Sequence, residues 1–352
     1  MKIDGKILRW YEKNRRELPW RETRDPYHVW LSEVILQQTR VSQGLDYYYR
    51  FLSAFPDVSA LAAASEDEVM KLWQGLGYYS RARNLHQAAR EIVTAQGGKL
   101  PETYAGWLKV KGVGAYTASA IASICFGEPR AVVDGNVSRV IARLYGVESP
   151  VNSSEGAKEI AALAEGLLDA RDPGTHNQAI MEFGALQCVP RGPDCHPCPL
   201  NDHCNAHLSG RVEMLPVKRP KKKPVDRYLY YYIMVHGQET MLTRREEADI
   251  WQSLYQFPAV DSEVPIGEEE LLSCRLRKLL NGVPPEKIKI RKISATIRHQ
   301  LTHRTIHARF IHLDPGRWPK PLPEGWIPIL TKNLDDFPVP RLINRYMEVV
   351  KF

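Results

Sequence analysis

The sequence predicts two domains, an all-α domain followed by a smaller α/β domain. The chain has 352 residues, which exceeds the length of one typical domain. Apolar residues recur with a helical period from residue 3 to about residue 206, whereas the last third shows the alternation of strands. A stretch rich in Pro and Lys separates the two patterns. The apolar share of 43% allows both domains to bury a core.

Residues 1–209 form the predicted helical domain. Apolar stripes over residues 7–11 and 29–34 have the spacing of amphipathic helices. Asp25-Pro26 is typical of a helix N-cap and first turn, and Asp134-Gly135 precedes the apolar run 137–144 in the same way. These signals predict several short helices that begin at capped positions.

Residues 210–227 are predicted to be a basic, Pro-rich linker. Its lysines suit either a solvated spacer or contacts with phosphates. After it, residues 228–235 and 305–313 have the pattern of strands, and residues 268–280 have that of a helix. The second domain therefore spans residues 228–352 and is of the α/β class.

The charge of the chain limits its partners. A formal net charge of +7 and an isoelectric point near 9.0 favour a polyanion such as nucleic acid. No apolar run is long enough to cross a bilayer, and the first residues lack the apolar core of an export signal. We expect a cytoplasmic, nucleoid-associated protein without a membrane partner.

Four of the six cysteines lie within seventeen residues: Cys188, Cys195, Cys198 and Cys204. Their spacing predicts one metal centre, since a reducing compartment disfavours disulfides. Zinc sites usually show two tight Cys pairs and this loop has one, so the spacing favours iron–sulfur and leaves zinc open.

Two glycines, Gly112 and Gly114, separate apolar helical stretches within residues 108–118. A hairpin there presents free backbone N–H groups, and a helix N-terminus attracts a phosphate. Lys109 and Lys111 flank the turn. The alternative is a plain connection between two helices.

The hairpin and the Cys-x6-Cys-x2-Cys-x5-Cys spacing together resemble the helix-hairpin-helix DNA glycosylases that carry a [4Fe-4S] cluster. Other segments resemble the MutY-type adenine DNA glycosylases of that superfamily: Leu18-Pro-Trp-Arg21, Trp30-Leu-Ser-Glu-Val-Ile-Leu-Gln-Gln-Thr-Arg40, Gly75-Leu-Gly-Tyr-Tyr79, Val133-Asp-Gly-Asn-Val137 and Asn177-Gln-Ala-Ile-Met-Glu182. The resemblance implies a helix-hairpin-helix domain with the cluster and a Nudix-like lesion-recognition domain. It also implies a monomeric enzyme of base excision repair, which removes adenine mispaired with 8-oxoguanine or guanine in duplex DNA.

Such chemistry requires a proton for the departing base and stabilisation of an oxocarbenium-like sugar, which two carboxyl groups can supply. Glu33 is the predicted general acid, because burial on its apolar helix would raise its pKa. Asp134 is the predicted stabiliser of the sugar or a transient nucleophile. A solvated glutamate and a simple helix N-cap are the respective alternatives.

Tyr116 stands where lyase-competent relatives of this superfamily carry a lysine. A phenol cannot form a Schiff base with the sugar, so the resemblance implies a monofunctional glycosylase in which Tyr116 hydrogen-bonds near Asp134. The alternative is a tyrosine of the core.

The resemblance also implies roles for residues around a flipped adenine. The adenine pocket would comprise Trp20, Arg21, Leu36, Gln178 and Met181. Gln38 and Tyr78 would form a wedge in the duplex, and Thr39 and Leu76 would lie against the lesion strand. Thr302 and His303 would read the lesion, although Leu301 replaces the aromatic residue that the family has in this loop. Arg191 would join Lys109, Lys111, Gly112 and Gly114 at the DNA backbone.

The second domain is not expected to hydrolyse nucleotides, since residues 268–278 lack the order Arg-Glu-x-x-Glu-Glu of a Nudix metal-binding helix. A metal site at His299, His303 and His307 is disfavoured, because the sequence shows no nearby carboxylate or cysteine to complete it. Trp251 and Phe257 are assigned to the domain core.

Two other functions stay open. The chain could be a relative that excises another base with lyase activity, which Tyr116 disfavours. It could also be a DNA-binding protein without catalysis, which the presence of both Glu33 and Asp134 disfavours.

Overall fold

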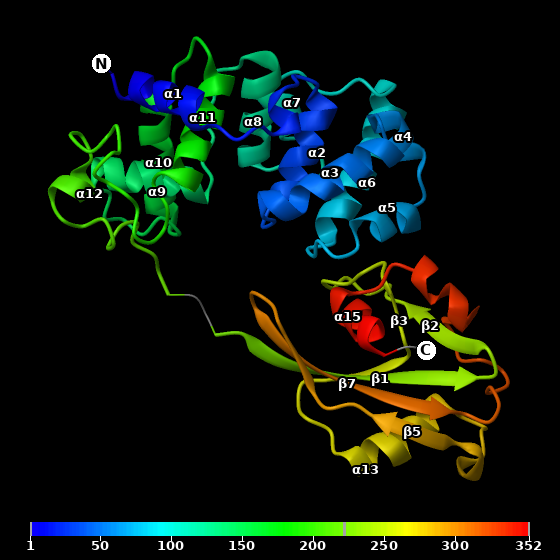
Figure 1. Ribbon diagram of the computed structural model, residues 1–352. Coiled ribbons are helices and arrows are strands. Elements are labelled where there is room, and N and C mark those ends of the chain that lie inside the picture. Colours follow the sequence, from blue (N-terminus) through cyan, green and yellow to red (C-terminus); the bar gives the residue numbers. More distant parts are fainter. Residues whose placement is uncertain (1, 221–222, 351–352) are drawn as a thin grey trace. The chain divides into compact units, whose positions relative to one another are not determined.

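The computed structural model describes residues 2–220 and 223–350, which form two compact units (Figure 1). The helical unit comprises residues 2–63 and 84–220. The C-terminal unit comprises residues 64–83 and 223–350. The chain thus passes between the units after residues 63, 83 and 220, whereas the sequence-based division placed all of residues 64–83 in the first domain.

The helical unit consists of short helices, as predicted for this part of the chain. Asp25 caps its helix by accepting hydrogen bonds from the backbone N–H groups of Tyr27 and His28, and Asp134 accepts one from Val137. Both predicted N-caps are therefore confirmed. The elements are α1 (Ile3–Asn14), η1 (Pro19–Arg21), α2 (Pro26–Leu36), α3 (Val41–Ala54), α4 (Val58–Ala63), α6 (Ser80–Gln96, whose first turn belongs to the C-terminal unit), α7 (Tyr104–Trp107), α8 (Ala115–Phe126), α9 (Gly135–Tyr145), α10 (Ser154–Leu167), α11 (Pro173–Leu186) and α12 (Asn205–Leu208).

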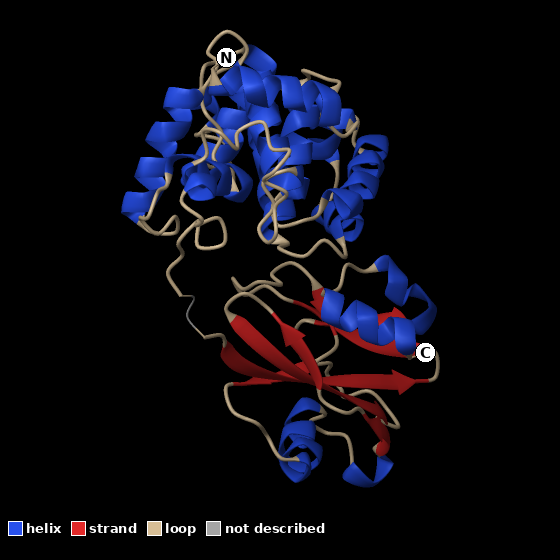
Figure 2. Ribbon diagram, turned by 60° about the vertical axis from the view of Figure 1, so that its left-hand side comes forward, coloured by secondary structure: helices blue, strands red, loops and turns tan. Residues whose placement is uncertain are grey.

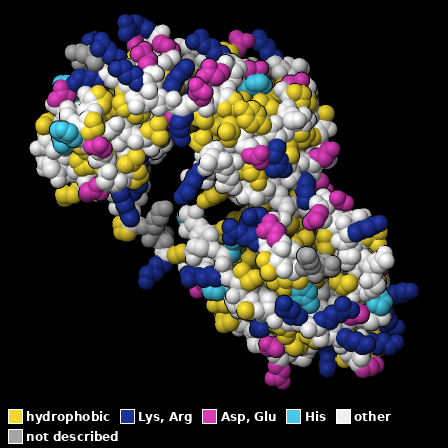
Figure 3. All heavy atoms as spheres, in the orientation of Figure 1, with side chains coloured by type: hydrophobic (Ala, Val, Ile, Leu, Met, Phe, Trp, Pro, Cys, Tyr) yellow, Lys and Arg dark blue, Asp and Glu magenta, His cyan; other side chains and the backbone are white. Residues whose placement is uncertain are grey.

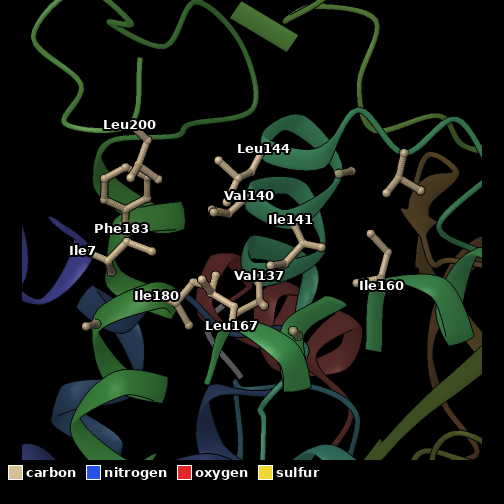
Figure 4. Close-up of a cluster of buried hydrophobic side chains, with 14 of the residues drawn as sticks. Ile7, Val137, Val140, Ile141, Leu144, Ile160, Leu167, Ile180, Phe183 and Leu200 are labelled. Carbon is tan, nitrogen blue, oxygen red and sulfur yellow. The ribbon is translucent and has the colours of Figure 1, made fainter. Parts of the chain in front are cut away.

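One hydrophobic core joins α1, α9, α10 and α11 (Figure 4). Val140 and Ile141 of α9 pack with Ile180 and Phe183 of α11. Leu200, from the loop that carries the four clustered cysteines (residues 188–204, the cysteine loop), joins the same core. Each such side chain contributes about 1.5–3 kcal/mol when it leaves water. This core fixes the position of α11, which carries several of the predicted base-pocket residues.

The predicted linker is shorter than expected. Residues up to Arg219 pack on the helical unit. Leu215 is buried and its carbonyl accepts a hydrogen bond from Arg143, the carbonyl of Val217 accepts one from Val151, and the backbone of Arg219 bonds to the side chain of Asn152. The backbone carbonyls of this Pro-rich stretch thus find partners, which a solvated spacer would leave to water. Lys221 and Lys222 lie outside the described residues.

Residues 223–350 contain eight strands in one mixed sheet of order β3-β2-β1-β7-β5 (Figure 2). β4 also pairs with β1, β6 with β7, and β8 with β2. β1 and β7 form the parallel pair at its centre, and the other pairs are antiparallel. The strands are β1 (Val225–His236), β2 (Glu239–Arg244), β3 (Tyr255–Gln256), β4 (Ala259–Ser262), β5 (Lys289–Ile293), β6 (Ile297–Gln300), β7 (Arg304–Asp314) and β8 (Trp326–Leu330).

Helices cover both faces of this sheet (Figures 1 and 2). One face packs against α13 (Glu268–Glu270), a π-helical turn (Leu271–Arg275) and α14 (Leu276–Leu279). The other packs against α15 (Arg341–Val349), where Tyr346 stacks on Phe310 with ring centroids 3.7 Å apart. Short 3-10 turns lie at Pro285–Lys287 and Thr331–Asp336. The predicted strands and helix are confirmed, as is the burial of Trp251 and Phe257.

Residues 64–83 contain α5 (Glu66–Trp73) and attach to the rest of the C-terminal unit through side chains. Gln74 hydrogen-bonds to Asn344, and the hydroxyl of Tyr255 donates to Asp67. Arg83 donates to the carbonyl of Gln252. These polar side chains explain why a segment from the first third of the sequence belongs to the C-terminal unit. Among the described residues, none of the helices is long and apolar enough to span a membrane.

Candidate functional site

A cleft of about 690 Å³ opens in the helical unit between α2, η1, α8, α11 and the start of α9. It brings together every residue predicted for catalysis and for the base pocket. These residues, together with Thr39, are Trp20, Arg21, Glu33, Leu36, Tyr116, Asp134, Gln178 and Met181. They come from five elements distant in sequence, so only the folded chain forms the site.

Glu33 lies in α2, where all residues from Val29 to Ile35 are buried. Its side chain is only 8% exposed, and burial raises its pKa to about 7. The negative charge of Asp134 also raises this pKa, whereas a hydrogen bond from Tyr116 and the charge of Arg21 lower it. Near neutral pH Glu33 therefore holds a proton that it can donate, as its predicted role requires.

Asp134 occupies the N-cap of α9. One carboxylate oxygen accepts from the backbone N–H of Val137 at 2.7 Å, and the other accepts from the Asn136 amide at 2.8 Å. Burial raises the pKa of Asp134, and these hydrogen bonds oppose the rise. The carboxylate is thus held in one orientation while it lines the cleft.

Asn136 in turn connects this carboxylate to the cysteine loop. Its side-chain oxygen accepts from Arg139 at 3.0 Å, and Arg139 also donates to the carbonyls of Gly184 and Cys188. The sequence pattern did not indicate a role for either Asn136 or Arg139. A basic residue on the buried face of α9 is the signal that could have indicated one.

Tyr116 lies in the first turn of α8, with its hydroxyl in the cleft. It hydrogen-bonds to Glu33 and lies 3.5 Å from the sulfur of Met181. The sequence predicted that Tyr116 would hydrogen-bond near Asp134. The structure gives Tyr116 a hydrogen bond to the other carboxyl group, because α8 packs against α2.

Glu182 ends one of the motifs that resemble the family, but the sequence pattern did not assign it a function. It is 1% exposed and accepts hydrogen bonds from the side chains of both Arg16 and Arg21, at distances from 2.5 to 3.0 Å. These hydrogen bonds lower the pKa of Glu182 to about 2. A charged residue among apolar ones on α11 was the available signal.

Gln178 is oriented by a residue that the sequence analysis did not associate with the site. The hydroxyl of Tyr11, in α1, donates to Oε1 of Gln178 at 3.1 Å. The guanidinium of Arg21 lies over the Tyr11 ring, 5.6 Å from its centroid. A single buried tyrosine therefore contacts both polar residues of the predicted base pocket.

The four clustered cysteines line one small cavity, bounded by apolar side chains of α9 and α11. Arg143, which is 2% exposed, donates to the sulfur of Cys188 and to the carbonyls of Val189 and Pro190. The loop thus brings its four thiol groups to one small cavity. Within residues 2–220 and 223–350, three or more His, Cys, Asp or Glu side chains nowhere converge on a single-ion site.

The predicted hairpin is the turn between α7 and α8. Gly112 has φ +78°, and a Cβ atom there would lie 2.7 Å from Cβ of Asn84, so this position requires glycine. Gly114 is the N-cap of α8. Lys109 and Lys111 are exposed beside the turn, and Arg191 is exposed in the cysteine loop. Both glycines of the hairpin are exposed.

Two of the predicted wedge residues have unusual backbone conformations. Gln38, at the end of α2, has φ +59°, and Tyr78 has φ +49°. Such values cost non-glycine residues about 1–3 kcal/mol, and strained residues often mark functional sites. Gln38 is exposed in the helical unit, and Tyr78 is 52% exposed in the C-terminal unit.

Tyr78 and Thr302 are brought together within the C-terminal unit, where their hydroxyl groups lie 3.0 Å apart. His303 is exposed beside Thr302, while Leu76 is buried rather than presented at the surface. His307 on β7 has a carboxylate neighbour that the sequence did not indicate, because Asp226 on the neighbouring strand β1 lies 2.8 Å from it. Lys and Arg side chains are spread over the visible surface of this unit (Figure 3).

Comparisons with known proteins identify the families of both parts of the chain. Residues 31–169 match the HhH-GPD superfamily of base excision DNA repair proteins, and residues 229–349 match the NUDIX domain. Residues Glu33, Tyr116 and Asp134 lie inside the first match, whereas Arg21 and Gln178 lie outside it.

Two curated relatives cover most of this chain. The adenine DNA glycosylase of Buchnera aphidicola subsp. Schizaphis graminum is 30% identical over an alignment of 353 positions, which covers 98% of this chain and 97% of the relative. That of Buchnera aphidicola subsp. Baizongia pistaciae is 31% identical over 305 residues, 86% and 83% respectively. The solved structure of a thermostable thymine-DNA glycosylase is 31% identical, covers 58% of this chain and 95% of its own, and has a TM-score of 0.55.

Proposed function

Because this chain belongs to the adenine DNA glycosylase family, we propose that it hydrolyses the N-glycosidic bond of adenine mispaired with 8-oxoguanine or guanine in duplex DNA. The observation that carries this proposal is the cleft in which a protonated Glu33 and a fixed Asp134 lie with the predicted base pocket. A base in the duplex stack cannot enter such a cleft, so the adenine must be flipped out.

Glu33 acts as the general acid. Its pKa of about 7 leaves it protonated on a substantial fraction of molecules at neutral pH, and proton transfer to the adenine ring makes the base a better leaving group. The apolar environment of α2 supplies this property, since it disfavours the ionised carboxylate.

Asp134 stabilises the positive charge that develops on the sugar. Its two oxygens are oriented by Val137 and Asn136, so no reorganisation is needed when the bond breaks. The same orientation of the carboxylate suits electrostatic stabilisation of the sugar and transient nucleophilic attack on it.

The enzyme is monofunctional in this proposal. Tyr116 hydrogen-bonds to Glu33 and cannot form a Schiff base with the sugar, so strand cleavage does not follow base release. Tyr116 instead orients the acid.

Cys188, Cys195, Cys198 and Cys204 would hold a [4Fe-4S] cluster. Four thiol groups around one small cavity fit this donor set. When bound, the cluster supplies a cross-link within the loop. The chain's own Arg143 and Arg139 attach that loop to α9, and the exposed Arg191 lies within reach of a DNA phosphate.

The C-terminal unit reads the base opposite adenine. Thr302, hydrogen-bonded to Tyr78 in the same unit, offers its hydroxyl group beside His303. In the helical unit, Gln38 enters the duplex as a wedge and Thr39 lies toward the lesion strand, and in the C-terminal unit the exposed Tyr78 is a wedge residue, whereas the burial of Leu76 argues against a direct contact of its side chain with DNA. The hairpin with Lys109, Lys111, Gly112 and Gly114 binds the DNA backbone. The protein works as a monomer on DNA in the cytoplasm, at the nucleoid.

The test is single-turnover base release from three duplexes, which place adenine opposite 8-oxoguanine, adenine opposite guanine, and thymine opposite guanine. We expect free adenine from the first two, fastest from the first, and alkali-dependent strand breaks. Asp134→Asn should lose activity while it keeps the N-cap hydrogen bond. Thymine release, or full activity of Asp134→Asn, contradicts the proposal.

For the cluster, purified protein should contain about four irons per chain and absorb visible light, and Cys198→Ser should lose both properties. Cys274→Ser is the matched control, because Cys274 is exposed in the C-terminal unit. A colourless protein that contains zinc would refute the cofactor assignment.

A further inference from the structure

Tyr11 links α1 to the base pocket. Its side chain is 3% exposed, and its hydroxyl donates to Oε1 of Gln178. When Oε1 is engaged in this way, the other branch of the amide, the Nε2 group, is left for a ligand in the cleft that Gln178 lines. Gln178 then presents a hydrogen-bond donor.

The second polar residue of the pocket presents donors as well. Arg21 has five N–H groups, and the hydrogen bonds to Glu182 and to the carbonyl of Arg16 engage Nη1 and Nη2. The Nε–H group is not part of these bonds. Glu182 receives hydrogen bonds from both arginines, so its carboxylate is occupied as an acceptor.

A protonated Glu33 adds another donor to the same cleft. A ligand that satisfies these groups must offer acceptors. The unprotonated ring nitrogens of adenine are such acceptors, whereas its 6-amino group is a donor.

These readers lie outside the superfamily match at residues 31–169. A thymine-DNA glycosylase shares the fold, so the fold alone does not select the base. Both observations are expected if side chains of α1, η1 and α11, which surround a shared catalytic centre, select the base.

We propose that Tyr11 is a positioning residue that sets base specificity, by holding Gln178 and Arg21 so that the pocket presents only donors to the ring nitrogens of the base. This inference rests on the proposed removal of adenine. It assigns the orientation of the pocket to a residue of α1 that does not line the cleft.

The first test is Tyr11→Phe, which removes the hydroxyl and keeps the ring under Arg21. Base release is measured for adenine and for its 1-deaza and 3-deaza analogues, in which a C–H group replaces one ring nitrogen. The wild-type protein should release the slower analogue about tenfold more slowly than adenine, as expected for one lost hydrogen bond. Tyr11→Phe should slow adenine release about tenfold and leave that analogue nearly unchanged.

A double-mutant cycle separates positioning from a structural effect. In a Gln178→Ala background, Tyr11→Phe should have no further effect on adenine release, since the residue that it orients is absent. Additive effects, or an equal decrease on adenine and on the analogues, overturn the inference. If the wild-type protein releases no adenine at all, the proposed function fails instead.

Tyr27→Phe is the matched control. Tyr27 is as buried as Tyr11 and donates its hydroxyl to the carbonyl of Phe55, away from the cleft. It should leave both rates and their ratio unchanged. Gln178→Glu provides a second test if Tyr11→Phe does not fold: it replaces the donor by an acceptor of equal size, and retained discrimination between adenine and the analogues would overturn the inference.

Discussion

Two regions of the cleft in the helical unit each contain a buried glutamate, and they give it opposite charge states. Glu33 on α2 and Glu182 on α11 are 8% and 1% exposed. Glu33 is surrounded by apolar side chains and has a pKa of about 7, whereas Glu182 accepts hydrogen bonds from Arg16 and Arg21 and has a pKa of about 2. Similar burial thus gives a proton donor in one region and a permanent anion in the other. The difference lies in the partners that each side chain meets.

The largest effect is expected when the donor is removed. Glu33→Gln keeps the shape of the side chain but cannot transfer a proton, so the single-turnover rate should fall by roughly 10²–10⁴-fold. The rate is measured on adenine opposite 8-oxoguanine. Glu159→Gln, at an exposed position of α10, is the control and should match the wild-type protein. A Glu33→Gln variant with more than a tenth of the wild-type rate removes Glu33 from the mechanism.

The second prediction concerns the paired region. Glu182→Gln leaves the buried Arg21 without its counter-charge, so the free energy of unfolding should decrease by about 3–5 kcal/mol. Denaturant titration at pH 7 measures this difference. If Glu182→Gln is as stable as the wild-type protein, the ion pairs are not what keeps Glu182 charged.

The third prediction is that the corresponding substitution of Glu33 increases stability at high pH, whereas that of Glu182 decreases it. Because the folded-state pKa of Glu33 is raised from 4.5 to about 7, the stability that its proton confers is present at low pH and is lost as the pH rises through about 7. Glu33→Gln removes this loss and should be more stable than the wild-type protein at pH 9, by up to about 3 kcal/mol, but not at pH 5. Thermal unfolding at both pH values provides the comparison, and a stability difference independent of pH contradicts it.

The smallest effect is expected at Tyr116. Its hydrogen bond lowers the pKa of Glu33, so Tyr116→Phe should raise that pKa and extend activity to higher pH by up to about one unit. The measurement is the alkaline limb of the single-turnover rate. A limb that moves to lower pH would mean that the hydroxyl stabilises the protonated form of Glu33.

The sequence predicted the separate parts of this site better than the relations between them. Helix caps at Asp25 and Asp134 and the burial of Glu33 depend on neighbours in sequence, and all three are confirmed. Contacts between residues distant in the sequence are not indicated by any local sequence pattern. Tyr11 with Gln178, Arg16 with Glu182, and Asp226 with His307 are separated by 167, 166 and 81 positions, and only tertiary packing brings them together.

The C-terminal boundary of the helical unit also could not be predicted from local sequence. The composition of residues 210–227 indicates a flexible connection, yet Leu215 is buried. Its carbonyl accepts a hydrogen bond from the side chain of Arg143 on α9, and the carbonyl of Val217 accepts one from the backbone N–H of Val151 before α10. The composition of a segment predicts whether it is flexible by itself. Here the hydrogen bonds between its carbonyl groups and Arg143 determine that it packs on the helical unit.

The assignment of residues 64–83 to the C-terminal unit has a practical consequence for anyone who divides this gene. A stop codon at residue 220 would remove the hydrogen-bond partners of Asp67, Gln74 and Arg83, which are the side chains of Tyr255 and Asn344 and the backbone carbonyl of Gln252. A gene for residues 223–350 alone would lack α5 and Tyr78. Neither half would be a complete folding unit, so expression of the C-terminal unit by itself would require a circular permutation or a graft that restores residues 64–83.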